Sequence, residues 1–228
     1  MQLAKPRVDI GLNTNNLEPM LAFWQGEVSV PFDHVLPIQK GMKQHRHDAR
    51  GSVLKINHYE AALPDTPPTG YAELLIAREG LAAEKAMHDP DGNAMRLVPP
   101  GTFGISQVGI RLKVRDLAAH KRFYAEALGL DEVPYAHGAA FRAGETVLLL
   151  EQSADAPNDA GMQGKGWRYI TFQVFKVNEE HPRILSRGGR EAMPPTALGT
   201  TARISMVRDP DGNWIEISQR ASITGTLD

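Results

Sequence analysis

The sequence predicts an α+β fold made of repeated strand and helix units, and three observations indicate this. The pentapeptide DPDGN occurs at residues 89–93 and again at 209–213, an offset of 120. Residues 16–24 also match residues 116–124 at an offset of 100. Asn16-Leu17 corresponds to Asp116-Leu117, and Phe23-Trp24 corresponds to Phe123-Tyr124. A run of alternating apolar residues precedes each of these segments. Two ordered matches favour a duplication, and their different offsets make the first copy the shorter one.

Each copy begins with a strand followed by an amphipathic helix. Residues 107–114 place apolar side chains at every second position, as in a strand with one buried face. Asp116 then occupies a helix N-cap position, and Gly129 ends the helix. Residues 8–13 alternate in the same way, and Asn16 is expected to cap a helix that tolerates Pro19 in its first turn.

Further strands and a second helix follow in each copy. Residues 138–142, 146–151 and 52–59 resemble strands between turn residues, and residues 167–174 and 178–186 predict a second strand and helix. A full copy therefore holds two β-α-β-β-β units. In the first copy, the space before DPDGN admits only a short helix at residues 80–87. The DPDGN segments themselves have the composition of tight turns.

A proline and glycine joint at residues 99–101 separates the copies. We therefore expect a shortened N-terminal domain at residues 1–99. A complete C-terminal domain is expected at 104–220, followed by a tail at 221–228.

The composition excludes several classes of protein. Hydrophobic residues make up 42% and charged residues 23%, as in water-soluble globular proteins. The net charge of −2 and the dispersed Lys and Arg give no sign of a nucleic-acid partner. We find no apolar run that could span a membrane and no secretion signal. With no Cys, disulfides and thiolate chemistry are excluded, and a cytoplasmic enzyme is expected. GxSxG, P-loop, GxGxxG and CxxC patterns do not occur.

Three segments together resemble the vicinal oxygen chelate superfamily of glyoxalases, bleomycin resistance proteins and extradiol dioxygenases. They are QVGIRLKVRDLAAHKRFYAEALGL, GWRYITFQV and RDPDGNWIEISQ. Residues 106–219 resemble one complete domain and residues 7–98 a truncated one. The resemblance implies two tandem domains whose βαβββ modules curl into half-open barrels. It also implies a small oxygenated substrate and a cavity that commonly holds a divalent metal.

The same resemblance implies three metal-ligand positions in the second copy. Glu216 matches the carboxylate that follows the DPDGN turn, and Tyr169 falls where many relatives have His. The first-strand position falls on Gly109, with Gln107 two residues earlier on the same face. The set Gln107, Tyr169 and Glu216 is unusual for Fe²⁺, Mn²⁺ or Zn²⁺, which favour imidazole and carboxylate ligands. One bound divalent metal and a metal-free site are both left open.

The first copy fits a metal less well. Arg96 stands at its carboxylate position, where a cation would repel a metal, and Asp9 stands at its first-strand position. One interpretation is an ion pair between Asp9 and Arg96 across the barrel. In the other, Arg96 binds an anionic group of the substrate.

The densest group of polar residues lies in residues 44–48, followed by Lys55, Asn57 and His58. His45 and His47 share one face of a predicted strand and could together bind a metal. A role in lining a substrate pocket or a domain interface is the preferred interpretation.

Arg111 is expected to point into the cavity of residues 106–219, paired with Glu216 or with a substrate anion. We expect Glu216 to act as metal ligand or general base, Arg111 to stabilise negative charge and Tyr169 to donate a proton. Gln107 and Trp214 would contact the substrate. This favours lyase or isomerase chemistry on a carbonyl, enol or phenol. The alternatives are a sequestering protein of the resistance type, a ring-cleaving dioxygenase and a structural subunit without a site. Edge strands make a homodimer plausible.

Overall fold

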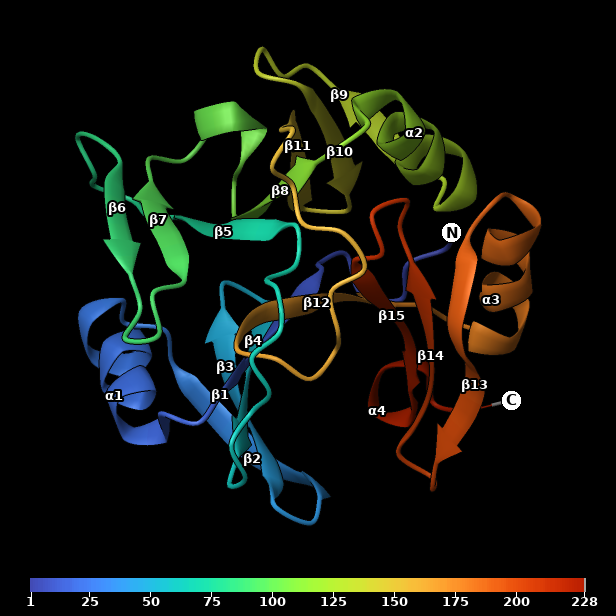
Figure 1. Ribbon diagram of the computed structural model, residues 1–228, viewed down its shortest axis with the longest axis horizontal. Helices are drawn as coiled ribbons and strands as arrows, with labels where there is room; N and C mark the ends of the chain where they lie inside the picture. The colour runs from blue at the N-terminus through green and yellow to red at the C-terminus, as the bar shows by residue number, and fades with distance from the viewer. Residues whose placement is uncertain (228) are drawn as a thin grey trace.

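A computed structural model describes residues 1–227 and shows an α+β fold in which two strongly curved sheets carry helices on their outer faces (Figure 1). The first half of the chain contributes β1 (Asp9–Thr14), β2 (Phe32–Gln39), β3 (Met42–Ala49), β4 (Ser52–Tyr59), β5 (Tyr71–Ala77), β6 (Lys85–His88) and β7 (Ala94–Val98). The second half contributes β8 (Val108–Val114), β9 (Asp131–Val133), β10 (Ala139–Ala143), β11 (Thr146–Gln152), β12 (Gly166–Gln173), β13 (Arg190–Leu198), β14 (Ala202–Arg208) and β15 (Trp214–Arg220).

The helices are short and connect the strands. They are α1 (Leu17–Leu21), η1 (Ala22–Glu27), η2 (Thr102–Gly104), α2 (Leu117–Arg122), η3 (Phe123–Ala127), α3 (Val177–Ser186) and α4 (Ala221–Thr224). The Asp116 side chain accepts from the Ala119 N–H at 3.0 Å, which confirms the predicted cap. Asn16 makes no such bond, and its side chain instead donates to Asp91 of the first DPDGN turn at 3.3 Å. No helix in residues 1–227 has the length and apolarity that crossing a bilayer requires.

The helix expected at residues 80–87 is wrong, because part of that segment forms β6. This strand pairs antiparallel with β7, from Lys85 opposite Leu97 to His88 opposite Ala94. The backbone groups along this edge of β7 thereby gain hydrogen-bond partners, which a helix would not supply.

Each sheet combines strands from both halves of the chain. The eight-stranded sheet has the order β13-β14-β15-β12-β1-β4-β3-β2, and the seven-stranded sheet has the order β6-β7-β5-β8-β11-β10-β9. The first module (β1 to β4) therefore pairs with the last module (β12 to β15), and the two middle modules (β5 to β7 and β8 to β11) pair with each other (Figure 1). The cavity that we expected within residues 106–219 is not formed, because β8 and β15 belong to different sheets.

A local two-fold axis relates the two modules of the eight-stranded sheet. Strands β1 and β12 pair antiparallel with Ile10 opposite Ile170, so a residue in β1 corresponds to the residue 160 positions later in β12. The parallel neighbours β4 and β15 stand in the same relation to them. The outer side packs into a continuous core, in which the rings of Trp24 and Trp167 meet edge to face at 5.9 Å.

Candidate functional site

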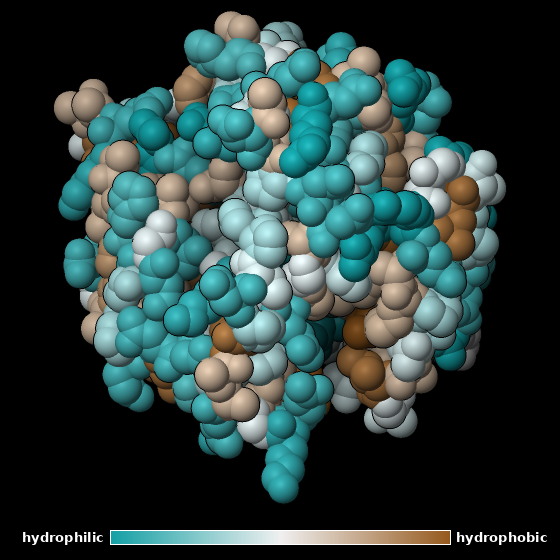
Figure 2. All heavy atoms as spheres, viewed as in Figure 1, coloured by the Kyte–Doolittle hydropathy of each residue, from teal (hydrophilic) through white to brown (hydrophobic). Residues whose placement is uncertain are grey.

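The concave side of the eight-stranded sheet holds a cavity of about 290 Å³ between the first and last modules. Its inner wall is polar and includes Gln44, Lys55, Asn57, Tyr169, Glu216 and Arg220. Its mouth is mostly apolar and includes Ile38, Met42, Leu198, Ile204 and Met206. Figure 2 shows hydrophobic atoms beside a recess in the lower half of the view, between the regions of β2 and β13. The site therefore combines an apolar entrance with a charged interior.

Alternation along β3 and β4 decides which polar residues face this cavity. In the antiparallel register, Gln44 lies opposite Asn57 and Arg46 lies opposite Lys55, which places all four on the concave face. The histidines of β3 point the other way. The cavity wall is thus made by the neighbours of the histidines.

His45, His47 and His58 are not part of the cavity wall. His45 pairs with Ile56 and His47 with Leu54, two residues of the core. His47 Nε2 lies 3.0 Å from the side-chain nitrogen of Gln25, on the helix that covers this face. Burial lowers the pKa of His47 to about 4, so this imidazole is neutral at pH 7. The expected pocket role of these residues does not fit their positions.

A chain of hydrogen bonds fixes the hydroxyl of Tyr169 in the cavity. Its oxygen accepts from the side-chain amides of Gln44 at 3.3 Å and Asn57 at 3.2 Å. Asn57 also donates to Asn13 at 3.0 Å, and Arg46 donates to Gln44 at 2.7 Å, so each amide is oriented. Burial raises the pKa of Tyr169 above its usual value. The phenol therefore keeps its proton and can donate it to an oxygen in the cavity.

Lys55 and Glu216 meet at the centre of the cavity wall. Lys55 Nζ lies 2.6 Å from Thr171 Oγ1, 3.4 Å from Glu216 Oε2 and 5.1 Å from the centre of the Tyr169 ring. The Lys55 side chain is 2% exposed and the Glu216 side chain 11%. Burial lowers the pKa of Lys55, while the nearby Glu216 carboxylate opposes this shift. The pair places a buried ammonium beside a carboxylate that lines the cavity.

Lys55 and Glu216 also occupy equivalent positions about the local two-fold axis. Lys55 lies beside Gly11 of β1, and Glu216 lies beside Thr171 of β12, which corresponds to Gly11. The first module therefore presents an ammonium where the last module presents a carboxylate.

The residues present do not fit a divalent metal. A metal held by Glu216 would meet the ammonium of Lys55, and Tyr169 is a protonated phenol rather than an anionic ligand. Within residues 1–227, no three His, Asp or Glu side chains converge on a common point where an ion could bind. The positive charge in this cavity is supplied by the protein itself.

Gln107 directly precedes β8 and Arg111 lies in it, so neither shares the cavity that holds Glu216. Arg111 forms ion pairs with Glu73 at 2.9 Å and Glu151 at 3.2 Å. The side-chain oxygen of Gln107 accepts from Arg50 Nε at 2.8 Å. The expected pair of Arg111 with Glu216 is wrong, because β8 and β15 belong to different sheets and Arg111 is paired with Glu73 and Glu151.

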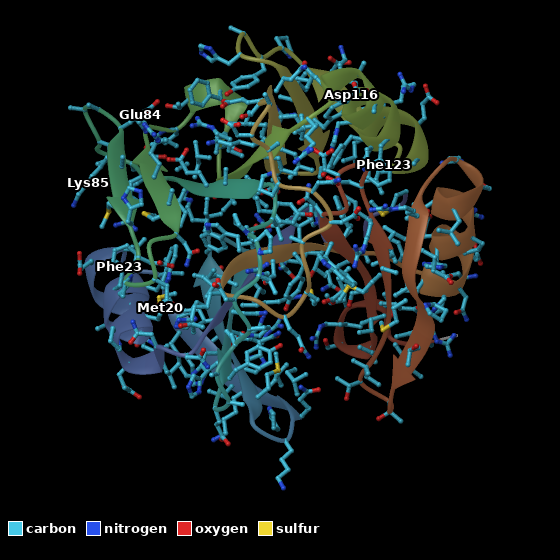
Figure 3. All side chains as sticks on the ribbon, viewed as in Figure 1. Met20, Phe23, Glu84, Lys85, Asp116 and Phe123 are labelled. Atoms are coloured by element: carbon cyan, nitrogen blue, oxygen red, sulfur yellow. The ribbon has the colours of Figure 1, made fainter. Side chains whose placement is uncertain are left out.

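Arg96 and Asp9 are separated in the same way, so the expected ion pair between them is also wrong. Arg96 binds Glu73 at 3.0 Å and Glu84 at 2.8 Å. Glu84 lies beside β6 at the outer edge of the seven-stranded sheet (Figure 3). Asp9 is buried on the concave face of β1 and accepts from Lys5 Nζ at 2.7 Å.

Trp214 supports a loop and does not line the cavity. Its indole N–H donates to the carbonyl of Ala160 at 2.8 Å, and the guanidinium of Arg208 lies 4.0 Å from the ring centre. The expected substrate contact at Trp214 therefore has no support in the geometry.

Sequence reasoning missed Gln44, Arg46 and Arg220 as site residues. Arg220 ends β15 on the same face as Glu216, four positions further along the strand. Alternation from Glu216 could have identified it. Gln44 and Arg46 could have been found only from the pairing register of β3 with β4.

Comparison with known proteins identifies the family. The model of the Glyoxalase/Bleomycin resistance protein/Dioxygenase superfamily matches residues 104–217. Glyoxalase I from Zea mays superposes with a TM-score of 0.77 at 13% identity, covering 96% of this chain and 92% of that one. A "putative dioxygenase" from Bacillus subtilis superposes with a TM-score of 0.73 at 12% identity, covering 96% and 85%. These structures share the fold, and no curated protein sequence matches the chain. With half of its length matched by the family model and the module pairing described above, the chain belongs to the Glyoxalase/Bleomycin resistance protein/Dioxygenase superfamily.

Proposed function

We propose that this protein is an enzyme that moves a proton within a small carbonyl, enol or phenolic substrate, as a lyase or isomerase. One observation supports this most directly: a carboxylate, a buried ammonium and a protonated phenol lie on one cavity wall. These are the groups that proton abstraction next to a carbonyl requires.

Glu216 is the general base in this proposal. It takes a proton from carbon beside the substrate carbonyl, and the C–H electron pair becomes a carbon–carbon double bond. The carbonyl oxygen then carries the negative charge of an enolate. If the first carbon carries a hydroxyl, its O–H proton moves to the enolate oxygen, and return of the proton from Glu216 to the former carbonyl carbon gives the isomeric carbonyl compound. If the next carbon carries a leaving group, its loss from the enolate with the bonding electron pair gives a lyase product.

Lys55 and Tyr169 stabilise the enolate oxygen. The ammonium lies in a buried position where a charge acts more strongly than it does in water, and the phenol has a hydrogen that is free to donate. Thr171 and Glu216 hold the ammonium, while the amides of Gln44 and Asn57 hold the phenol oxygen. Both donors are therefore fixed before the substrate arrives.

Proton transfer is favoured over ring-cleaving dioxygenation by the donor set. Iron-dependent ring cleavage ordinarily uses two His and one Glu, whereas this cavity offers Tyr169, Lys55 and Glu216. We therefore assign no step to a metal.

Sequestration of a small molecule is the second candidate function. The apolar mouth of the cavity favours it, because such a rim would hold a planar or apolar molecule without any chemistry. The two candidates differ in whether the protein catalyses proton exchange.

Deuterium exchange tests the proposal. The protein is mixed in D₂O with a panel of small ketones, 2-hydroxy ketones and 2-oxo acids, and loss of the proton signal next to each carbonyl is followed by NMR. We expect catalysed exchange for at least one class, and a decrease of about 100-fold or more in Glu216→Gln. Glu126→Gln, an exposed position on η3, is the matched control and should keep the full rate.

Two results would count against acid–base catalysis. Equal exchange rates in Glu216→Gln and the unmodified protein would remove Glu216 as the base. Tight binding of a panel member without any catalysed exchange would favour sequestration.

A further inference from the structure

A second hollow of about 440 Å³ adjoins the cavity at the end of β15, and Arg220 lines both. Arg46 and Gln173 also line the hollow, beside Asp9 of β1. None of these residues has a role in the proton transfer described above. The hollow therefore belongs to the same concave face, but the proposed function assigns it no role.

Two arginines in this hollow lack the partners that buried guanidinium groups require. Arg46 is 6% exposed, and its one hydrogen bond among the described residues goes from Nη1 to Gln44. The Nε atoms of Arg46 and of half-buried Arg220 are both buried without any hydrogen-bond partner in residues 1–227. A buried donor that stays unpaired costs about 1–3 kcal/mol, and more when it is charged. Such groups point to a ligand that supplies the missing acceptors.

The charge of the surrounding wall also favours an anion. The buried and half-buried cations are Lys5, Arg46, Lys55 and Arg220, whereas the buried carboxylates are Asp9 and Glu216. Lys5 neutralises Asp9 at 2.7 Å, and Lys55 lies next to Glu216 at 3.4 Å. Asp33 and His34 lie 2.9 Å apart at the exposed rim. The two arginines are left as surplus positive charge.

Arg46 and Arg220 lie close enough to repel each other. Burial lowers the pKa of Arg46, and the charge of Arg220 lowers it further. An anion between the two guanidinium groups would remove this repulsion and accept from both Nε atoms.

Further unpaired polar groups lie on β12 and β15 of the same concave face. Ser218 is fully buried on the concave face of β15, two residues after Glu216, and its hydroxyl has no hydrogen-bond partner among the described residues. It lies opposite Gln173, whose amide donates to Asp9 at 3.3 Å and whose oxygen is also unpartnered. Of the two residues, only Gln173 lines the hollow, and its oxygen can accept from a protonated oxygen of a bound group.

We propose that Arg46 and Arg220 form a subsite for an oxyanion, either a carboxylate or a phosphate, carried by the substrate. This inference rests on the proposed function, because the oxyanion belongs to the molecule whose carbonyl lies near Glu216. The substrate is then a small anionic carbonyl compound, bound with its charged end at the hollow and its reacting carbon at the cavity wall.

Anion binding can be tested without knowledge of the reaction. Nitrogen-15 NMR of arginine Nε–H groups is recorded while inorganic phosphate is added in one arm and glycolate in the other. We expect saturable shifts at Arg46 and Arg220 with a dissociation constant in the range of about 1–10 mM in at least one arm. A response to phosphate alone assigns a phosphate ester, a response to glycolate alone assigns a carboxylate, and a response to both supports the shared oxyanion chemistry.

Substitutions identify the site. Arg220→Gln should weaken binding by about tenfold or more, because half-buried Arg220 supplies one of the two charges. Arg122→Gln, an exposed arginine on α2, is the matched control and should bind as the unmodified protein does. At Arg46 the substitution is Arg46→Lys, because a neutral residue at this buried position could prevent folding. Lysine keeps the charge but lacks the Nε–H donor, so this variant should also bind the anion more weakly.

The proposal is overturned if neither anion gives a saturable shift up to about 50 mM, or if Arg220→Gln binds as tightly as the unmodified protein. Glu216→Gln should bind both probes normally, so failure of the acid–base proposal would leave the result of this experiment unchanged.

Discussion

At the scale of single residues, the positive charge of Lys55 distinguishes this cavity from a metal site. Lys55 and Glu216 are equivalent about the local two-fold axis, yet one is a cation and the other an anion. A divalent ion would be attracted by two facing carboxylates, but here the ammonium already provides the positive charge. In the proposed mechanism, Lys55 therefore takes the electrostatic role of a bound cation.

Lys55→Glu should create a metal site. The introduced carboxylate would lie across the axis from Glu216, and two carboxylates at close range bind a divalent cation to relieve their repulsion. We expect calorimetry to show Mn²⁺ or Zn²⁺ binding with a dissociation constant of about 1–100 μM in this variant.

Two controls limit this interpretation. Lys113→Glu makes the same change at an exposed position on β8 and should bind no metal. If elemental analysis finds stoichiometric metal in the unmodified protein and Glu216→Gln loses it, the assignment of Lys55 as the resident cation is wrong.

At the scale of the elements, the pairing of β1 with β12 positions the tyrosine of the site. Gly11 lies opposite Tyr169, and the phenol ring covers the glycine. A β-carbon built on Gly11 would lie 2.3 Å from Cε1 and 2.4 Å from Cζ of Tyr169. The absence of a side chain in β1 therefore makes the space that holds the ring of β12.

Gly11→Ala should displace the Tyr169 ring from its two amide partners. Overpacking of this kind costs about 1–3 kcal/mol in the free energy of unfolding, measured by urea denaturation. The exchange reaction should slow as well, because the phenol hydroxyl moves. Gly26→Ala is the control, since a β-carbon there meets no atom within 4 Å. Equal stability and exchange rates in the two variants would show that the ring position is unimportant.

The alternation rule explains both the success and the failure of prediction for these strands. It placed Lys55 and Asn57 together correctly, because one strand has only two faces. It could not decide which face of β3 is concave, so the two histidines were preferred over Gln44 and Arg46. That choice depends on the pairing of β3 with β4, which is a contact between strands.

At the scale of the whole molecule, each sheet depends on both halves of the chain. Strand β12 needs β1 along one edge, and β8 needs β5. The edges that would be uncovered in an isolated half carry unpaired backbone groups next to core residues. Strand β2, at the edge of the eight-stranded sheet, already exposes Phe32, Val35 and Ile38, but the homodimer expected from the sequence stays a prediction.

Residues 104–228 expressed alone should not form a folded monomer. Without the first half, β8 and β12 lose their central neighbours, so the fragment should aggregate or pair with a second copy of itself. Light scattering after size-exclusion chromatography gives the mass, and urea denaturation shows whether unfolding is cooperative. A monomeric fragment that unfolds cooperatively would show that each half folds without the other.

The sequence by itself determined the repeated units, the strands and helices near residues 8–24 and 107–128, the family, and Glu216 with Tyr169 as neighbours in one module. These features follow from local periodicity, capping and turn chemistry, which act over a few residues. Only the tertiary structure decided that the first module joins the last. That pairing removed Gln107, Arg111 and Arg96 from the site and brought Lys55, Gln44 and Arg46 to Glu216. The physical reason is that strand pairing across some 160 residues depends on which edges meet in space, and no local pattern records it.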